Sequence, residues 1–217
     1  MQTISIPDLV HYHVYTGAAL PRVTALLGYD YVMAGNGVFL RCENKHLKAT
    51  FPVAVTAIAG LPDLSTEFTL KIPEVPNHIL VEILTDANSD RTREHMYQIK
   101  HNGSEYYWDQ PRQGGTLARV EYSIDEDKLS DDTNVVIDLH THPGKAYFSS
   151  IDNHDELGFR LYGVLGQTKK AGFNSIVMRL GVYGQYMCIQ PTDVFSEGTN
   201  LKEVVYGAYT ETVKSAL

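Results

Sequence analysis

The alternation of apolar and polar residues along the chain predicts a series of short strands and two amphipathic helices. Several runs have the β-branched, aromatic or alternating composition of strands, namely residues 10–15, 38–42, 46–55, 96–100, 105–108, 117–124, 135–140, 176–180 and 186–189. The sequence His101-Asn102-Gly103-Ser104 is a strong turn signal, so the strands on either side of it should form a hairpin. Glu43-Asn44-Lys45 similarly predicts a turn between the strands at 38–42 and 46–55.

Apolar residues recur at helical spacing in two places. The first predicts a helix over residues 77–88, from Ile79, Leu80, Ile83 and Leu84, and the second a helix over 152–167, from Leu157, Leu161, Val164 and Leu165. A short helical piece is expected around residues 23–27. Residues 60–75, which contain Pro62 and Pro73, should form loops.

Two histidines stand at the end of the apolar run Val135-Val136-Ile137, in the sequence Asp138-Leu139-His140-Thr141-His142-Pro143. Residues i and i+2 of a strand point to the same face, so the imidazoles of His140 and His142 can reach one ion. Asp152 follows at the start of the second predicted helix, from where its carboxylate can turn back toward them. Two histidines and one aspartate suit a catalytic zinc ion, which keeps a fourth position open for water.

A second pair of histidines with the same spacing provides an internal comparison. In Val10-His11-Tyr12-His13-Val14 the alternation puts the apolar residues on one face and the histidines on the other, as in an ordinary amphipathic strand. No Ser-x-x-Asp sequence follows this pair. We therefore interpret His11 and His13 as residues of an amphipathic strand and His140, His142 and Asp152 as zinc ligands.

The sequence His140-x-His142-Pro143, followed by Ser149-x-x-Asp152, resembles the signature of the JAB/MPN (JAMM) zinc metalloproteases. The usual spacer between the second histidine and the serine is seven residues in that family, and it is six here if Ser149 is the match. Counting from Ser150 restores seven, but the aspartate position would then be Asn153, a poor zinc ligand. Ser149 and Asp152 are therefore the preferred match.

The residues around this motif are similar to a bacterial branch of the family, the PRTRC system protein A group. That group also carries an AGNGVFLR-like stretch, found here at residues 34–41, and a GVYG-like strand, found at 181–184. The resemblance runs from about residue 30 to 195. It implies an α+β, three-layer-like fold of the JAB1/MPN, cytidine-deaminase-like type, in which a mixed sheet is flanked by helices and the hairpin of residues 38–55 comes first.

The resemblance also implies one JAB/MPN-like domain over residues 1–217. Its core would cover about 30–195, with residues 1–29 as an N-terminal extension and residues 60–95 as an insertion-like loop and helix. A chain of 217 residues can bury a sizeable core without disulfides. Its 43% hydrophobic and 20% charged residues are ordinary for a globular protein.

Charge and composition narrow the functional classes. The net charge of −8 argues against a nucleic-acid groove. The two cysteines, Cys42 and Cys188, are expected to be buried thiols of a reduced, cytoplasmic protein. The N-terminus lacks the features of a signal peptide, and no run has the roughly 18 apolar residues that a membrane span needs.

The implied chemistry is zinc-dependent hydrolysis of a peptide or isopeptide bond. Ser149 would hydrogen-bond the oxyanion, or cap the following helix. JAMM proteases take a proton from the zinc-bound water with a glutamate near the start of the first hairpin, but residues 34–37 contain no acid. Glu43 is the nearest upstream acid, although five extended residues span about 17 Å. We assign Glu43 as the candidate base, with Glu67 and Glu121 as more remote candidates.

Two functions from different classes follow from these observations. The first is a zinc metallopeptidase of the JAMM type, and the family suggests the tail of a ubiquitin-like protein as its substrate. The second is a noncatalytic, metal-binding scaffold that binds other proteins of a bacterial PRTRC-like system, which the missing acid near Asn36 motivates. A third, a metal-dependent hydrolase of small amides, stays open.

Overall fold

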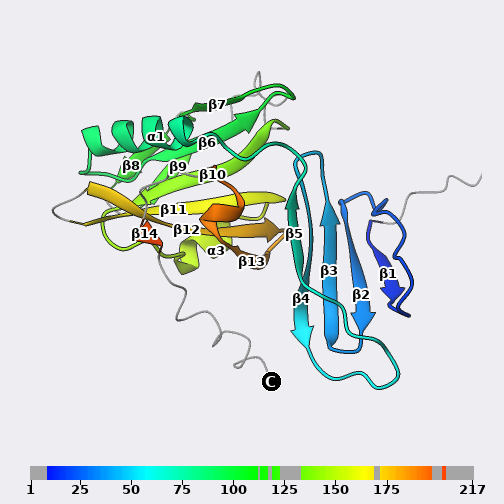
Figure 1. Cartoon of the computed structure of the whole chain (residues 1–217). Helices are drawn as coiled ribbons and strands as arrows, with labels where there is room; N and C mark the ends of the chain where they lie inside the picture. Colours follow the sequence, from blue (N-terminus) through cyan, green and yellow to red (C-terminus); the bar gives the residue numbers. More distant parts are fainter. Residues whose placement is uncertain are drawn as a thin grey trace, which may run out of the picture. The chain divides into compact units, whose positions relative to one another are not determined.

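The computed structural model describes residues 9–111, 113–116, 119–122, 133–168, 172–196 and 202–203. Its contacts divide the chain into two compact units, one that ends at Pro73 and one that begins at Glu74 (Figure 1). Each unit has its own sheet.

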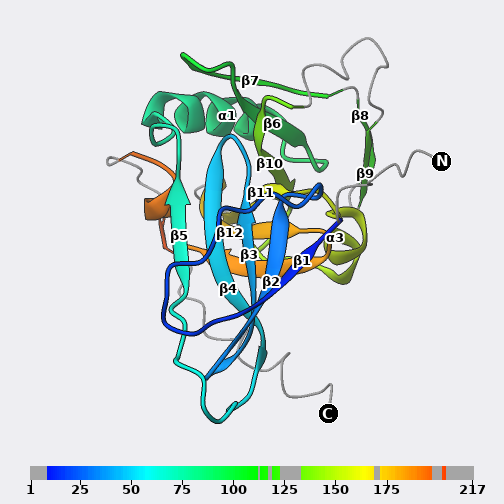
Figure 2. The same ribbon diagram turned by 90° about the vertical axis from the view of Figure 1, so that its right-hand side faces the viewer.

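The N-terminal unit is a five-stranded mixed sheet in the order β1-β2-β3-β4-β5. The strands are β1 (His11–Val14), β2 (Tyr29–Ala34), β3 (Gly37–Glu43), β4 (Leu47–Val55) and β5 (Glu67–Leu70). β1 pairs with β2 in parallel and all other neighbours are antiparallel. Figure 2 shows β1 at one edge, beside β2. The buried side chains of Val32, Ala34 and Phe39 form a small core under Leu20 and Leu64.

The C-terminal unit is built on a second mixed sheet, in the order β13-β12-β11-β10-β6-β7 with β14 beside β12. Its strands are β6 (Met96–His101), β7 (Tyr106–Asp109), β10 (Val135–His142), β11 (Arg160–Thr168), β12 (Gly172–Val182), β13 (Gln185–Ile189) and β14 (Lys202–Glu203). The helices described are α1 (Asn77–Ser89), α3 (Ser150–Asp155) and a 3-10 turn, η2 (Pro191–Asp193); β8 (Gln113–Thr116) and β9 (Arg119–Tyr122) form a separate two-stranded sheet.

β10 lies inside this sheet, and its two faces meet different helices. Residues 135–139 are all buried, as expected for a strand covered on both sides. Tyr97, the register partner of Leu139, donates a hydrogen bond from its hydroxyl to Asp86 of α1 at 2.8 Å. His140, on the opposite face, approaches Asp152 of α3. The helices α1 and α3 therefore lie on opposite faces of the sheet (Figure 1).

The pairing of β10 with β11 explains where α3 sits. The two strands are parallel, and parallel neighbours need a crossover connection rather than a hairpin. Residues 143–159, which include α3, make this crossover. The end of β10 that carries the histidines is therefore followed directly by a segment that must pass over the face of the sheet, and this segment carries Asp152.

The expected fold class, a three-layer α+β sheet flanked by helices, is wrong. The described residues contain far more strand than helix and form two mixed sheets and one two-stranded sheet, and α1 and α3 are their α-helices. The predicted helix over 152–167 accounts for much of the error, because α3 ends at Asp155 and residues 160–168 form β11. Residues 161–166 are all buried, and periodicity does not separate such an apolar run from a buried helix.

Other predictions of secondary structure have mixed outcomes. The helix at 77–88 and the hairpins at 38–55 and 96–108 are confirmed. The hairpin at 38–55 lies in the N-terminal unit as β3 and β4, so it does not open the sheet that carries His140. Residues 23–27 form coil and turn rather than a helix, and the loop predicted at 60–75 contains β5.

In the strand predicted at 117–124, β9 covers residues 119–122, and positions 117–118 and 123–124 lie outside the described residues. Cys42 and Cys188 are both unpaired, although Cys188 is exposed rather than buried. Within the described ranges, no helix is long and apolar enough to cross a membrane.

The crossover after β10 depends on a close approach at Gly166. A Cβ atom there would lie 2.1 Å from the backbone nitrogen of Ala146 and 2.7 Å from the carbonyl carbon of Lys145. The Gln167 amide also donates a hydrogen bond to the Gly144 carbonyl oxygen, at 2.6 Å. The chain can therefore fold back across β11 only because position 166 has no side chain.

We predict that Gly166→Ala lowers the free energy of unfolding of the C-terminal unit by about 1–3 kcal/mol, because the backbone at residues 145–146 must move. Gly144→Ala is the matched control, since a Cβ atom there meets nothing within 4 Å. Trp108, the single tryptophan, lies in this unit, so its fluorescence during urea denaturation follows the transition. An unchanged transition in Gly166→Ala would contradict the packing described here.

Candidate metal centre

His140 and His142 occupy alternate positions at the end of β10 and point to the same face of the sheet. Their Nε2 atoms are 3.1 Å apart. Asp152 Oδ1 lies 3.3 Å from Nε2 of His140, and Asp152 Oδ2 lies 3.9 Å from Nε2 of His142. Ligand atoms 2.0–2.1 Å from a tetrahedral zinc ion are roughly 3.3–3.4 Å apart. The three side chains therefore fit a divalent metal ion with little rearrangement.

The position of Asp152 is fixed by a capping box at the start of α3. Ser149 is the N-cap residue, and its Oγ accepts a hydrogen bond from the Asp152 amide at 3.2 Å. In return, Asp152 Oδ2 accepts a hydrogen bond from the Ser149 amide. This reciprocal pair satisfies two backbone donors of the helix start and orients the carboxylate. Oδ1 is left facing His140.

The neighbouring Asn153, the alternative motif residue, contacts Arg179 rather than the histidines. Its Oδ1 accepts a hydrogen bond from Nη1 of Arg179. The structure thus brings Asp152 rather than Asn153 to the histidines, as expected from the preference for Ser149 and Asp152.

Arg179 of β12 connects α3 to the sheet. The guanidinium group is buried and stacks 3.9 Å from the ring centroids of both Phe148 and Tyr186. Its Nε donates to Oε2 of Glu156 at 2.8 Å, and Nη2 donates to the same oxygen. The hydroxyl of Tyr186 donates to the carbonyl oxygens of Asn153 and Glu156, both at 3.0 Å. The segment that carries Asp152 is therefore held by one buried cation and its partners.

Glu156 approaches His140 on the side of the ring opposite Asp152. Its Oε1 is 4.0 Å from Nδ1 of His140, the ring nitrogen that points away from Asp152. This separation is too long for a hydrogen bond, so Glu156 acts on His140 through its charge, which favours the protonated imidazole. Burial raises the pKa of Glu156 to about 7, against the opposing effect of the Arg179 charge.

The protonation states reflect how closely these groups are packed. Burial disfavours the charged form of His140, but the hydrogen bond to Asp152 and the negative charges of Asp152, Glu156 and Glu94 together outweigh burial and raise the pKa of His140. Burial and the neighbouring His140 charge lower the pKa of His142 to about 4. Burial alone would raise the pKa of Asp152, yet its contacts with His140 and Ser149 lower it to about 2. A charged Asp152 and a neutral His142 are the forms in which these side chains bind metals.

An acidic residue that the sequence did not single out lies beside this cluster. Oε1 of Glu94 is 4.0 Å from Nε2 of His142, and burial raises the pKa of the Glu94 carboxyl. Two hydrogen bonds join His95, the residue after Glu94, to Thr141, the residue before His142. The Thr141 amide donates to the His95 carbonyl oxygen at 2.9 Å, and the His95 amide donates to Thr141 Oγ1 at 2.8 Å. These bonds continue the β6–β10 pairing beyond Met96 and His140 and bring Glu94 close to His142.

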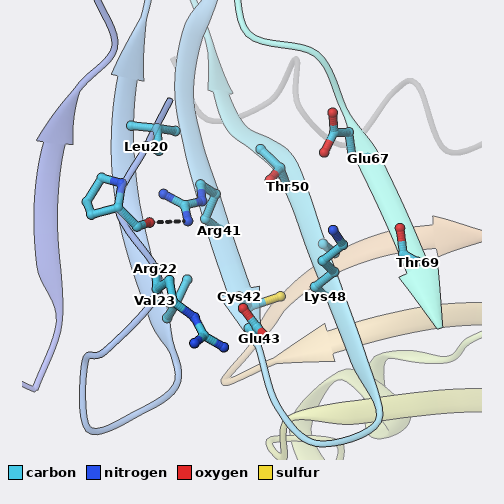
Figure 3. A pocket seen from close by; sticks show the side chains of 12 residues that line it. Leu20, Arg22, Val23, Arg41, Cys42, Glu43, Lys48, Thr50, Glu67 and Thr69 are labelled. Carbon is cyan, nitrogen blue, oxygen red and sulfur yellow. Dashed lines mark hydrogen bonds between the residues drawn. The ribbon is translucent and has the colours of Figure 1, made fainter. Parts of the chain in front are cut away.

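Glu43, the candidate base from the sequence, lies at the end of β3 in the N-terminal unit. Its carboxylate forms an ion pair with Lys71, with Oε1 2.7 Å from Nζ, and this hydrogen bond lowers its pKa. Figure 3 shows Glu43 lining a pocket of about 230 Å³ on that sheet, together with Lys48. Glu67 lines the same pocket, and the side chain of Glu121 lies outside the described residues.

Residues 34–37, where the family resemblance would place the catalytic glutamate, form a turn. Gly35 and Asn36 form the turn between β2 and β3. The Asn36 side chain accepts from the Leu64 amide and donates to the Leu64 carbonyl oxygen, both at 3.0 Å. A Cβ atom at Gly35 would lie 2.3 Å from the Leu61 carbonyl oxygen. Gly35 and Asn36 therefore have a structural role, because they hold the β2–β3 turn against residues 61–64.

Comparison with family models gives no match for this chain, and no curated protein matches its sequence.

We predict that His140→Ala or His142→Ala removes one equivalent of bound zinc, because each variant lacks one of three protein ligands. His154→Ala is the matched control, since this exposed histidine of α3 lies outside the cluster. Zinc is counted by elemental analysis after gel filtration of the loaded protein. Equal zinc content in His140→Ala and His154→Ala would contradict the ligand assignment.

We also predict that Arg179→Met destabilises the C-terminal unit by about 3–5 kcal/mol, because Glu156 is left buried without its partner. The double variant Arg179→Met/Glu156→Gln should recover part of this loss, since it removes the unpaired charge. Urea denaturation followed through Trp108 fluorescence measures both. A double variant no more stable than Arg179→Met would show that the loss arises from the packing of Phe148 and Tyr186 alone.

Proposed function

We propose that the protein is a zinc-dependent metallopeptidase of the JAMM type that hydrolyses a peptide or isopeptide bond. The observation that carries the proposal is the approach of Glu94 to a cluster of two histidines and one aspartate. Metal-binding clusters are common without catalysis, but a largely buried carboxylate 4.0 Å from Nε2 of His142 would supply the acid–base group that hydrolysis needs.

A zinc ion held by His140, His142 and Asp152 would polarise the scissile carbonyl and make a bound water more acidic. The carboxylate of Glu94 would take a proton from the attacking water and transfer it to the leaving amine. This role belongs to Glu94 in our proposal, in place of Glu43, because Glu94 is adjacent to His142 and, among the described residues, forms no ion pair with a lysine.

Ser149 can serve the reaction as well as the fold. Its Oγ accepts the capping hydrogen bond from the Asp152 amide, which leaves the hydroxyl proton available to donate. In the proposed mechanism this proton is donated to the oxyanion of the tetrahedral carbonyl adduct. The two roles suggested by the sequence are thus compatible for one hydroxyl group.

Two exposed apolar side chains in the segment that follows the histidines could contact a polypeptide substrate. Tyr147 is 54% exposed and its ring centroid is 4.8 Å from that of His142. Ile151, on the first turn of α3, is 51% exposed. Following the motif resemblance, we propose the tail of a ubiquitin-like protein as substrate, with other proteins of the same bacterial system as further partners.

We predict that Glu94→Gln lowers the rate of zinc-dependent cleavage by about 10²–10⁴-fold, because the amide cannot accept the proton. Zinc content should stay unchanged, since Glu94 is not one of the proposed ligands. Glu43→Gln is the matched control and should cleave at the wild-type rate. Cleavage is measured with linear fusions of ubiquitin-like proteins to a reporter.

The pattern of results separates the alternatives. If Glu43→Gln loses activity and Glu94→Gln retains it, the assignment of the base is contradicted. If the zinc-loaded wild-type protein cleaves none of the fusions, the proposal of a peptidase fails and the noncatalytic scaffold becomes the better account.

A further inference from the structure

The histidine pair interpreted as an ordinary amphipathic strand faces the opposite way in the structure. Tyr12 and Val14 of β1 are 78% and 55% exposed, whereas the side chains of His11 and His13 are only 28% and 23% exposed. Two imidazoles thus turn inward from an edge strand while Tyr12 and Val14 point outward. A group that attracts imidazole must therefore lie on the inner face of β1.

That feature is Asp30. The parallel register of β1 and β2 pairs His11 with Asp30, so the carboxylate lies on the histidine face. Asp30 Oδ1 is 3.5 Å from Nδ1 of His11, and Asp30 Oδ2 is 3.3 Å from Nε2 of His13. These separations match the edge of a tetrahedral coordination shell, roughly 3.3–3.4 Å. One ligand atom from each residue lies within 4.8 Å of the others.

The carboxylate is buried and finds no hydrogen bond among the described residues. Asp30 is 0% exposed, and in this part of the chain neither of its oxygens has a hydrogen-bond partner; Nε2 of His13 is likewise buried without one. Taking an ionised carboxylate out of water is costly unless a cation or donors compensate for it. Arg41 is the register partner of Asp30 on β3, but its Nη2 donates to the Pro21 carbonyl oxygen at 2.7 Å (Figure 3).

We propose that His11, His13 and Asp30 form a second zinc site, independent of the proposed peptidase centre. Its zinc ion would cross-link the edge strand β1 to its neighbour β2. Zinc would supply the positive charge that the buried carboxylate requires. Three protein ligands leave the fourth position for water, which the part-exposed histidines make accessible. The ligand chemistry is the same as that of His140, His142 and Asp152, but a neighbouring strand rather than a helix supplies the carboxylate.

The test uses the full-length double variant His140→Ala/His142→Ala, so that the proposed C-terminal ligands are removed. This protein is loaded with zinc chloride, passed through gel filtration and analysed for zinc. We expect one equivalent of zinc to remain bound. Adding Asp30→Asn, which preserves the shape of the side chain, should remove it, whereas adding Tyr12→Ala on the exposed face of β1 should not.

Two results would overturn the proposal. One is a double variant that retains no zinc; the other is an Asp30→Asn derivative that retains its zinc. If the double variant does not fold, the same comparison is made in the wild-type background, where His13→Gln should lower zinc content from two equivalents to one. An unchanged zinc content in His13→Gln would also contradict the second site.

A thermal measurement distinguishes zinc from the other explanation, a protonated histidine beside Asp30. With zinc bound, a chelator should lower the melting temperature of the His140→Ala/His142→Ala protein but leave that of its Asp30→Asn derivative unchanged. An equal response of the two proteins to the chelator would show that no metal holds these residues together.

Discussion

The capping box of α3 is the interaction on which the candidate active site depends. Asp152 divides its two oxygens between two tasks: Oδ2 accepts from the backbone at the start of the helix, and Oδ1 faces His140. The helix cap therefore sets the orientation of the metal ligand, and any change in the path of α3 moves that ligand. Arg179, Gly166 and the parallel pairing of β10 with β11 all contribute to the same result, because each fixes where α3 begins.

Local sequence predicted much of this centre and little of what surrounds it. His140, His142, Ser149 and Asp152 lie within a short stretch whose spacing reflects a strand, a turn and a helix start, so their proximity follows from local geometry. Glu94 lies just before β6, far from the motif in sequence, and the antiparallel pairing of β6 with β10 brings it close to His142. The available signal was an acid directly before the strong hairpin at 96–108, but sequence alone does not say which strands become neighbours.

The errors in fold have the same origin. The strand β11 is buried on both faces, and its apolar residues also fit a helical pattern, so periodicity could not decide between the two. The face of β1 was predicted from the hydrophobicity of Tyr12 and Val14, yet the buried carboxylate of Asp30 turns the histidines inward. In both cases a residue or strand from another part of the chain determines the structure. The local pattern of apolar and polar residues does not reveal such a partner.

The most direct test of the central claim is a crystal structure of the zinc-loaded protein with an anomalous difference map measured at the zinc absorption edge. Our account predicts a peak bound by Nε2 of His140, Nε2 of His142 and Oδ1 of Asp152, with the Glu94 carboxylate facing the open side of the ion. It would be contradicted by zinc-loaded crystals with no peak at this position, or by a peak whose ligands exclude Asp152.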